Sequence, residues 1–297
     1  MSKIRECFTS RFDKGMLLEA DFSQLEIIAL AHLSGDPTMK EDILDGTDLH
    51  RIRAAQMYGK CARDVTPQER QIAKVFSFQL QYGAGATSMA ASCGVDVSIA
   101  KKFIADYYDR YPEVKAWQEK VAEEYAERRR PSQRVTPLGV TAGMGWHHSI
   151  TGRRYVMYED DNPYAGTRRW GEGGQEPATN FSPTKMKNYP VQGFATGDIV
   201  PMVLGEVFKM VMTKAWSTRY KLINTVHDSI LFDIAPRDDE ELLRFCTQLK
   251  GVMESAPKML KEEFNIDFEL PLKVDISVGK NWGVMEKYKW NGVLKDK

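Results

Sequence analysis

Cysteine is scarce in this sequence of 297 residues, and no two cysteines form a CxxC pair. The four are scattered at Cys7, Cys61, Cys93 and Cys246. This spacing argues against a zinc site and against a disulfide framework. We therefore expect free thiols in a reducing cytosol.

Long apolar runs and an excess of one charge are also missing. No stretch approaches the roughly 18 apolar residues of a membrane span, and the N-terminal MSKIRECFTS lacks the apolar core of a signal peptide. We expect a cytoplasmic protein with no membrane partner. The 41 basic and 41 acidic side chains give a formal net charge of zero, so composition alone does not favour nucleic acid as a partner.

Hydrophobic residues make up 42% of the chain, which is enough to bury a substantial core. An apolar run from Gly15 predicts a buried strand that ends at Asp21, followed by a helix that closes near Pro37. Apolar periodicity predicts further helices at 48–58, 66–82, 97–110, 112–130, 194–216 and 238–264. Short β-type runs predict strands around 153–158 and within 270–282. The Gly- and Arg-rich stretch 161–180 predicts a surface loop.

Two aspartates stand beside predicted strands. Asp21 ends the first strand, and LINTVHDSILFDI predicts a hairpin with His227, Asp228 and Ser229 at its turn. Taken singly, either aspartate is better explained as a turn or cap residue, because Asp favours such positions.

The helix predicted at 66–82 carries an ordered stripe of side chains. Thr66 and Glu69 form a capping-box pattern at its start, with Pro67 at the first helical position. At intervals of four come Arg70, Lys74, Phe78 and Tyr82. Two cations followed by two aromatic rings suit a nucleoside triphosphate lying along the helix. The alternative is an amphipathic helix with a solvated basic end and a packed aromatic end.

Three segments in order resemble the motifs of family A DNA polymerases, the DNA polymerase I-like group. ADFSQLE resembles the first palm motif, RQIAKVFSFQLQYG the fingers helix, and VHDS the third motif. DLHRIRAAQMYG, YYDRYPEVKAW, GRRYVMY, NYPVQGFATGD and PLKVDISVGKNW also resemble family segments. The resemblance implies an α+β fold, with a palm on an antiparallel β-sheet and a mainly helical fingers subdomain. It places the palm at 1–36 and 181–297, and the fingers with a connecting β and loop region at 37–180.

The resemblance also implies roles for individual residues. Two Mg²⁺ ions, with Mn²⁺ as the alternative, are expected on Asp21, Asp228 and the peptide oxygen of Phe22. Lys74 is expected to assist catalysis by protonating the leaving group. The expected nucleotide-binding residues are Gln24, Glu26, His50, Arg70, Lys74, Phe78 and Tyr82. The expected contacts to primer-template DNA are Asn188, Gln192 and His227.

Two of these assignments bear on which nucleotides are accepted. Glu26 is expected to block a ribose 2′-hydroxyl with Tyr82 as hydrogen-bond partner, although Ser23 and Glu26 equally form a capping box for the next helix. Phe78 lacks a phenol hydroxyl and is expected to disfavour dideoxynucleotides.

The chain departs from the family pattern at two places. Ser229 stands where the third motif usually has a glutamate, with Asp233 or Glu19 as nearby substitutes. Only 20 residues precede Asp21, so thumb and exonuclease domains are expected to be absent. We expect either a trimmed fragment or one subunit of a split polymerase, of a phage or bacterium, whose partner chain carries those domains.

The sequence thus predicts template-directed addition of deoxynucleotides to a primer. A relative of single-subunit RNA polymerases is one alternative, since these enzymes share the HDS triplet. A non-catalytic DNA-binding subunit of a replication complex is another.

Overall fold

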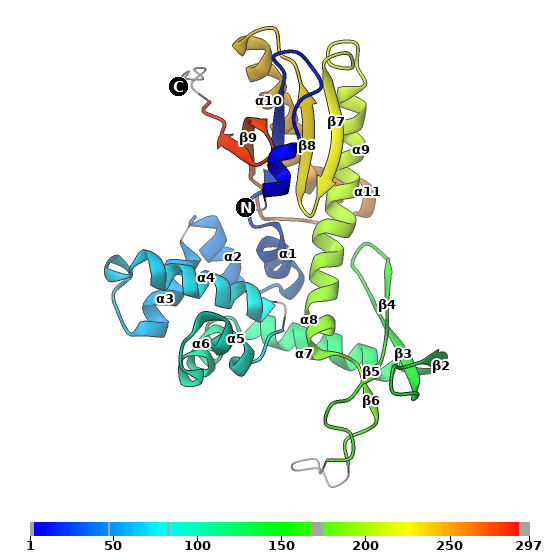
Figure 1. Ribbon diagram of the computed structural model, residues 1–297. Helices are drawn as coiled ribbons and strands as arrows, with labels where there is room; N and C mark the ends of the chain where they lie inside the picture. Colours follow the sequence, from blue (N-terminus) through cyan, green and yellow to red (C-terminus); the bar gives the residue numbers. More distant parts are fainter. Residues whose placement is uncertain (1–2, 47, 82, 168–174, 291–297) are drawn as a thin grey trace. The chain divides into compact units, whose positions relative to one another are not determined.

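The computed structural model describes residues 3–46, 48–81, 83–167 and 175–290. The chain divides into two compact units, described separately below. Unit 1 comprises Met1–Ile28 and Phe194–Lys297, and unit 2 comprises Ala29–Gly193. Mixed helices and antiparallel sheets confirm the predicted α+β class (Figure 1).

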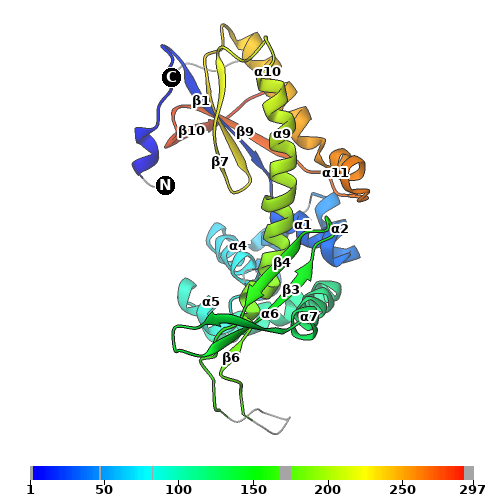
Figure 2. The same ribbon diagram turned by 90° about the vertical axis from the view of Figure 1, so that its right-hand side faces the viewer.

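Unit 1 is built on a five-stranded antiparallel sheet in the order β10-β9-β1-β8-β7. Its strands are β1 (Met16–Phe22), β7 (Tyr220–Val226), β8 (Ser229–Ile234), β9 (Val274–Asn281) and β10 (Val284–Lys287). The short helix η1 (Lys3–Cys7) precedes the sheet. Strand β1 is central, and Leu18 and Ala20 on it are fully buried. The β7–β8 hairpin and the β9 strand predicted from the sequence are therefore present (Figure 2).

Helices α9 (Val200–Val211), α10 (Asp239–Glu254) and α11 (Ala256–Phe264) complete unit 1. Phe245 of α10 packs its ring against Tyr220, at 4.3 Å between centroids, and against Phe232, at 5.6 Å. This aromatic cluster joins the helix to the sheet.

Two helices predicted in this part of the chain have different limits. The helix predicted at 238–264 is interrupted at Ser255, because Pro257 has no N–H to continue the hydrogen-bond ladder of α10. The helix predicted at 194–216 starts as the π-helix η3 (Gly193–Ile199) and ends at Val211. The prediction of one continuous helix at 238–264 was therefore wrong, whereas the helix predicted at 194–216 is continuous but ends five residues earlier than predicted.

Unit 2 is mainly helical. Helix α1 (Leu25–Ser34) leads into it from unit 1, and its own elements are α2 (Pro37–Leu44), α3 (Leu49–Tyr58), η2 (Ala62–Asp64), α4 (Pro67–Gln81), α5 (Ala86–Cys93), α6 (Val97–Arg110), α7 (Pro112–Glu127) and α8 (Pro183–Gln192). The capping box at the start of α4 is confirmed: the Thr66 hydroxyl accepts from the Glu69 N–H at 3.2 Å, and Glu69 accepts from the Thr66 N–H at 2.9 Å.

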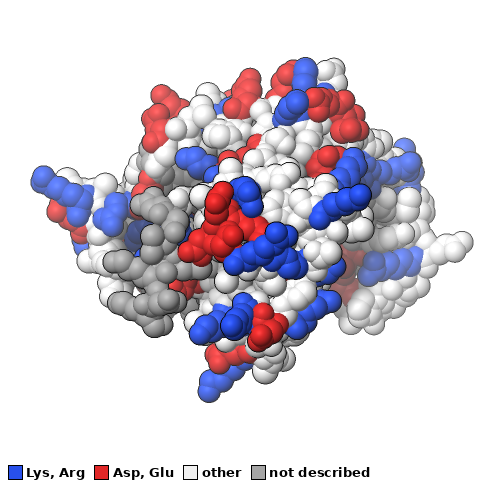
Figure 3. Space-filling view, turned by 90° about the horizontal axis from the view of Figure 1, so that it is seen from above, with Lys and Arg blue, Asp and Glu red and all other residues white. Residues whose placement is uncertain are grey.

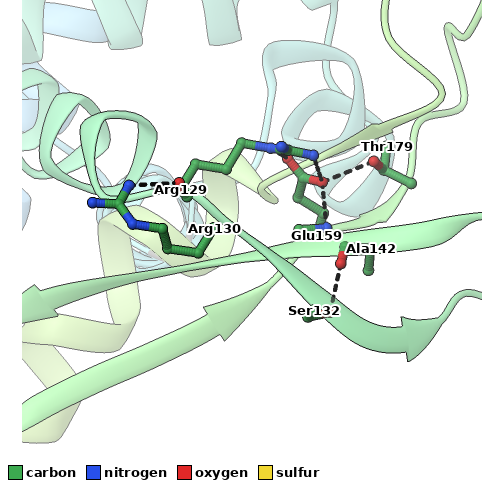
Figure 4. A network of polar contacts seen from close by, with 7 residues as sticks. Arg129, Arg130, Ser132, Ala142, Glu159 and Thr179 are labelled. Carbon is green, nitrogen blue, oxygen red and sulfur yellow. Dashed lines mark hydrogen bonds and ion pairs between the residues drawn. The ribbon is translucent and has the colours of Figure 1, made fainter.

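A small antiparallel sheet of β2 (Arg130–Val135), β3 (Thr141–His148) and β4 (Arg154–Tyr158) also belongs to unit 2. Figure 4 shows the buried carboxylate of Glu159, which accepts hydrogen bonds from residues in and beside this sheet. Arg129 donates to that carboxylate twice, at 2.6 and 2.9 Å, and the Gly143 N–H and Thr179 hydroxyl donate at 2.7 and 2.8 Å. The Arg130 guanidinium instead donates to the Arg129 carbonyl at 2.8 Å.

The predicted loop at 161–180 begins and ends in a two-stranded pairing. Strand β5 (Asp160–Asp161) pairs with β6 (Thr179–Asn180), and residues 168–174 lie outside the described part of the chain. None of the described helices is both long and apolar enough to cross a membrane. On the face shown in Figure 3, basic side chains lie among acidic ones.

Candidate active site

Asp21 and Asp228 meet at one end of the unit 1 sheet. Asp21 is the penultimate residue of β1, and Asp228 lies in the two-residue loop that joins β7 to β8. The Phe22 N–H donates to the Asp228 carbonyl at 3.2 Å, and a hydrogen bond joins the two aspartate carboxyl groups. Pairing of β1 with β8 therefore brings together two acids that are far apart in the sequence.

The hairpin loop holds Asp228 at its tip with a strained residue before it. His227 has a left-handed backbone, with φ of 56°, and its side chain is exposed. Two-residue hairpin loops need a positive φ, and for a residue with a Cβ this conformation costs roughly 1–2 kcal/mol. The predicted turn included Ser229, which was wrong: Ser229 is the first residue of β8 and pairs with Val226.

The electrostatics of the aspartate pair favour a bound cation. Partial desolvation of the carboxyl group, followed by the charges of Asp228 and Glu19, raises the pKa of Asp21 to about 7. Burial also raises the pKa of Asp228, against the lowering effects of its own N–H and of its hydrogen bond with Asp21. Ionising both of two facing carboxyl groups costs free energy because the charges repel, unless a positive charge is bound beside them.

The donor set fits a magnesium site that is completed by substrate. Within the described residues, no group of three or more His, Cys, Asp or Glu side chains is arranged to hold a metal. Magnesium needs only one or two protein carboxylates where phosphates and waters supply its other ligands. The carboxylates of Asp21 and Asp228 and the adjacent carbonyl of Phe22 are oxygen donors that suit such a site.

Of the two substitutes suggested for the missing glutamate, only Glu19 lies near the pair. The Ser229 hydroxyl and the Trp282 indole N–H each lie 3.2 Å from the Glu19 carboxylate. Asp233 is buried further along β8, where it accepts from Ser10 at 2.6 Å and pairs with Arg11 at 2.9 Å. Asp233 is therefore a structural residue.

The segment between β1 and α1 carries two predicted nucleotide-binding residues. Gln24 is exposed and left-handed, with φ of 59°, and Glu26 lies in the first turn of α1. The Ser23 hydroxyl, proposed to cap this helix, donates to Asp275 at 3.0 Å.

In unit 2, helix α4 displays the predicted stripe beside the N-terminus of α3. Arg70 Nε donates to Asp48 Oδ2 at 2.7 Å. One turn later, Lys74 Nζ lies 5.8 Å from the centre of the Phe78 ring, whose side chain is exposed. Three of the four residues of the predicted stripe, Arg70, Lys74 and Phe78, therefore lie in the described part of this helix in the predicted order.

His50 lies in α3 next to this stripe. Its ring is buried, 6.2 Å from that of Phe78 between centroids, and its Nδ1 has no hydrogen-bond partner among the described residues. Burial first, and then the charges of Arg53, Arg70 and Lys74, lower the pKa of His50 to about 4. His50 is thus neutral at physiological pH and can offer a hydrogen bond but no charge.

The end of α4 makes a close backbone approach to α8. Tyr82 lies outside the described residues, but Gly83 has φ of 74° and its carbonyl accepts from the Thr184 hydroxyl at 3.3 Å. A Cβ on Gly83 would lie 2.6 Å from Thr184 Cα, so only glycine fits.

Asn188 and Gln192 lie one turn apart on α8, where Asn188 Nδ2 donates to Gln192 Oε1 at 3.4 Å. Both line a pocket of about 340 Å³ that also includes Arg134, Tyr158 and Lys185. Asn188 Oδ1 is buried without a hydrogen-bond partner among the described residues.

Asp48 belongs to the DLH segment of the resemblance, although the resemblance implies no role for it. Asp48 is the N-cap of α3, and its carboxylate accepts from the Arg51 N–H at 3.1 Å as well as from Arg70. An aspartate just before a helical run signals a cap. No signal in the sequence indicates that Asp48 also contacts Arg70, because this contact depends on how α3 packs on α4.

Comparisons with known proteins agree on one family. The model of the family described as DNA polymerase family A matches residues 1–138 and 146–284. DNA polymerase I of Lactococcus lactis is 29% identical over 281 residues, and the thermostable DNA polymerase I of Thermus filiformis 29% over 280. Each alignment covers 94% of this chain but only 27% and 28% of the relative.

The fold is similar to that of a solved polymerase structure. That structure is the POL domain of Pol1 from M. smegmatis in complex with DNA primer-template and dNTP, with a TM-score of 0.67 and 24% identity. The match covers 94% of this chain and 42% of that one.

Proposed function

The chain belongs to DNA polymerase family A, and from this premise we propose that it extends a primer by template-directed addition of deoxynucleotides. The observation that carries the proposal is the facing pair of carboxyl groups, Asp21 and Asp228, at the end of adjacent strands. Because the two carboxylates repel each other, a divalent cation that binds between them lowers the electrostatic free energy of the site.

We propose that Asp21, Asp228 and the Phe22 carbonyl hold two magnesium ions, with Mn²⁺ as an effective replacement. Bound magnesium would activate the primer 3′-hydroxyl and neutralise charge on the leaving pyrophosphate. The 3′-oxygen forms a bond to the α-phosphorus, and the bond from that phosphorus to the bridging oxygen breaks. The hydroxyl proton passes to solvent, and Lys74 gives a proton to the departing pyrophosphate.

The side chains of α3 and α4 are proposed to bind the nucleotide. Arg70 and Lys74 supply positive charge to the triphosphate, and neutral His50 supplies a hydrogen bond. The exposed ring of Phe78 offers a flat apolar surface to the sugar and base. Tyr82, Gln24 and Glu26 complete the proposed nucleotide contacts, with Glu26 excluding a ribose 2′-hydroxyl.

Primer-template DNA is the proposed second ligand. The solved relative was captured with primer-template and dNTP, which supports the same ligand classes here. Asn188, Gln192 and His227 are proposed to contact the terminal pairs in the minor groove, where hydrogen-bond acceptors are nearly common to all pairs. A partner chain with thumb and exonuclease domains stays a prediction, tested by copurification from the source cells.

A primer-extension assay with the full chain, Mg²⁺ and each nucleotide class tests the proposal. We expect deoxynucleotide addition that follows the template, and its loss in Asp228→Ala. Asp275→Asn is the matched control, because Asp275 lies opposite Asp21 on β9 but is paired with Lys287 at 2.6 Å. Preference for ribonucleotides would support the RNA polymerase alternative, and extension by Asp228→Ala would refute the proposed site.

A further inference from the structure

Asp48 joins two helices through one carboxylate. Its Oδ1 accepts from the Arg51 N–H at 3.1 Å and so caps α3, while its Oδ2 accepts from Arg70 Nε on α4 at 2.7 Å. The Arg51 guanidinium donates through Nη1 to the carbonyls of Ala62 and Val65 at 3.2 and 3.1 Å, while its Nε lies 3.8 Å from Asp48 Oδ2, which is too far for a hydrogen bond. The strong side-chain contact of Asp48 is therefore the one with Arg70.

The geometry of that contact determines which edge of the guanidinium is left for a ligand. A guanidinium can grip a phosphate with two parallel N–H bonds, either through Nε and one Nη or through the two Nη groups. Asp48 contacts Arg70 at Nε. Only the edge formed by the two Nη groups then remains for paired donation to a phosphate.

From this geometry we infer that Asp48 is a positioning residue, which fixes the Arg70 guanidinium so that its Nη edge faces the triphosphate. The inference rests on the proposed function for the identity of the ligand. Asp48 itself touches no phosphate and acts only through Arg70.

Asp48 could act in three ways, by positioning Arg70, by capping α3 alone, or by competing with the phosphates for Arg70. The three predict different effects on nucleotide affinity when the charge of Asp48 is removed. If Asp48 only caps α3, nucleotide affinity should not depend on its charge. If its charge merely competes with the phosphates for Arg70, removing the charge should strengthen nucleotide binding. Positioning alone predicts that removing the charge weakens binding.

Two substitutions separate the cap from the ion pair. Asp48→Asn keeps a good N-cap but loses the charge, whereas Asp48→Glu keeps the charge but is a poorer cap. Asp96→Asn is the matched control, since Asp96 caps α6 by accepting from the Ser98 N–H at 2.8 Å. Circular dichroism of each full-length variant verifies folding.

Binding of dATP and of inorganic tripolyphosphate is measured by calorimetry with Mg²⁺ and without primer. We expect about fivefold to tenfold weaker binding of both probes by Asp48→Asn, the scale of one ordinary hydrogen bond. Asp48→Glu should recover part of the loss, and Asp96→Asn should bind as the wild type does. In an Arg70→Ala background, Asp48→Asn should have no further effect.

Three results would each overturn the inference. The first is unchanged or tighter binding by Asp48→Asn, and the second is an equal loss of affinity when Asp48→Asn is made in the Arg70→Ala background. The third is that the wild type binds neither probe. Because the assay needs no catalysis, its result is separate from that of primer extension. Failure of extension with the expected binding pattern would reject the proposed reaction and leave the role of Asp48 standing.

Discussion

Asp228→Asn should make the metal-free protein more stable at alkaline pH. In the folded chain the two carboxyl groups face each other, and the pKa of Asp21 is raised to about 7. A group whose pKa is raised by folding binds protons more tightly in the folded state. Its contribution to stability therefore falls as pH rises from about 4 to 7, and the full penalty applies above pH 7.

The size of this penalty can be bounded. The difference between the ordinary value of 3.8 and about 7 corresponds to roughly 4 kcal/mol, at 1.36 kcal/mol for each tenfold change in proton affinity. Asp21 is exposed, so solvent screening reduces that figure, and desolvation contributes a part that the substitution does not remove. We expect a gain of about 1 kcal/mol at pH 8.5 and a smaller gain at pH 5.

Thermal and urea unfolding in EDTA, at both pH values, measures this gain. Taking the difference between variant and wild type at each pH cancels the titration of other groups. Asp275→Asn is the control, because a hydrogen bond from Lys287 lowers the pKa of Asp275, and its removal should give no gain. A loss of stability in Asp228→Asn, or a gain that is larger at pH 5, would refute the idea of repelling carboxylates.

Two further predictions concern unit 2 and are checked by urea unfolding. Arg129→Ala should cost about 2–4 kcal/mol, because it leaves the buried carboxylate of Glu159 without its cation, whereas Arg130→Ala should cost under about 1 kcal/mol. Equal losses would contradict the network in Figure 4. Gly83→Ala should cost about 1–3 kcal/mol, because the left-handed backbone is strained for alanine and the new Cβ would press on Thr184. Wild-type stability of this variant would show that α8 can move away.

Local sequence rules predicted the elements whose signals are local. The capping box of Thr66 and Glu69 started α4 at Pro67, and apolar periodicity predicted α6 with its observed limits, 97–110. Helix α8 was missed because it is short and polar and contains Pro190, a residue that usually argues against a helix.

The candidate site was predictable as a set of residues but not as a set of contacts. Motif resemblance singled out Asp21 and Asp228, and the pairing of β1 with β8 brings them together. The interaction of Glu19 with Ser229 and that of Asp48 with Arg70 depend on strand register and helix packing. Neither has a signal in local sequence spacing.

Binding of Mn²⁺, followed by its electron paramagnetic resonance signal at pH 8, tests the central claim most directly. The proposed metal site predicts that the wild-type chain binds Mn²⁺ and that Asp21→Asn and Asp228→Asn each weaken binding by at least about tenfold. Asp275→Asn should bind within about twofold of the wild type, since its carboxylate is committed to Lys287. Wild-type affinity in Asp228→Asn, or an equal loss in Asp275→Asn, would contradict the claim that Asp21 and Asp228 form the metal site.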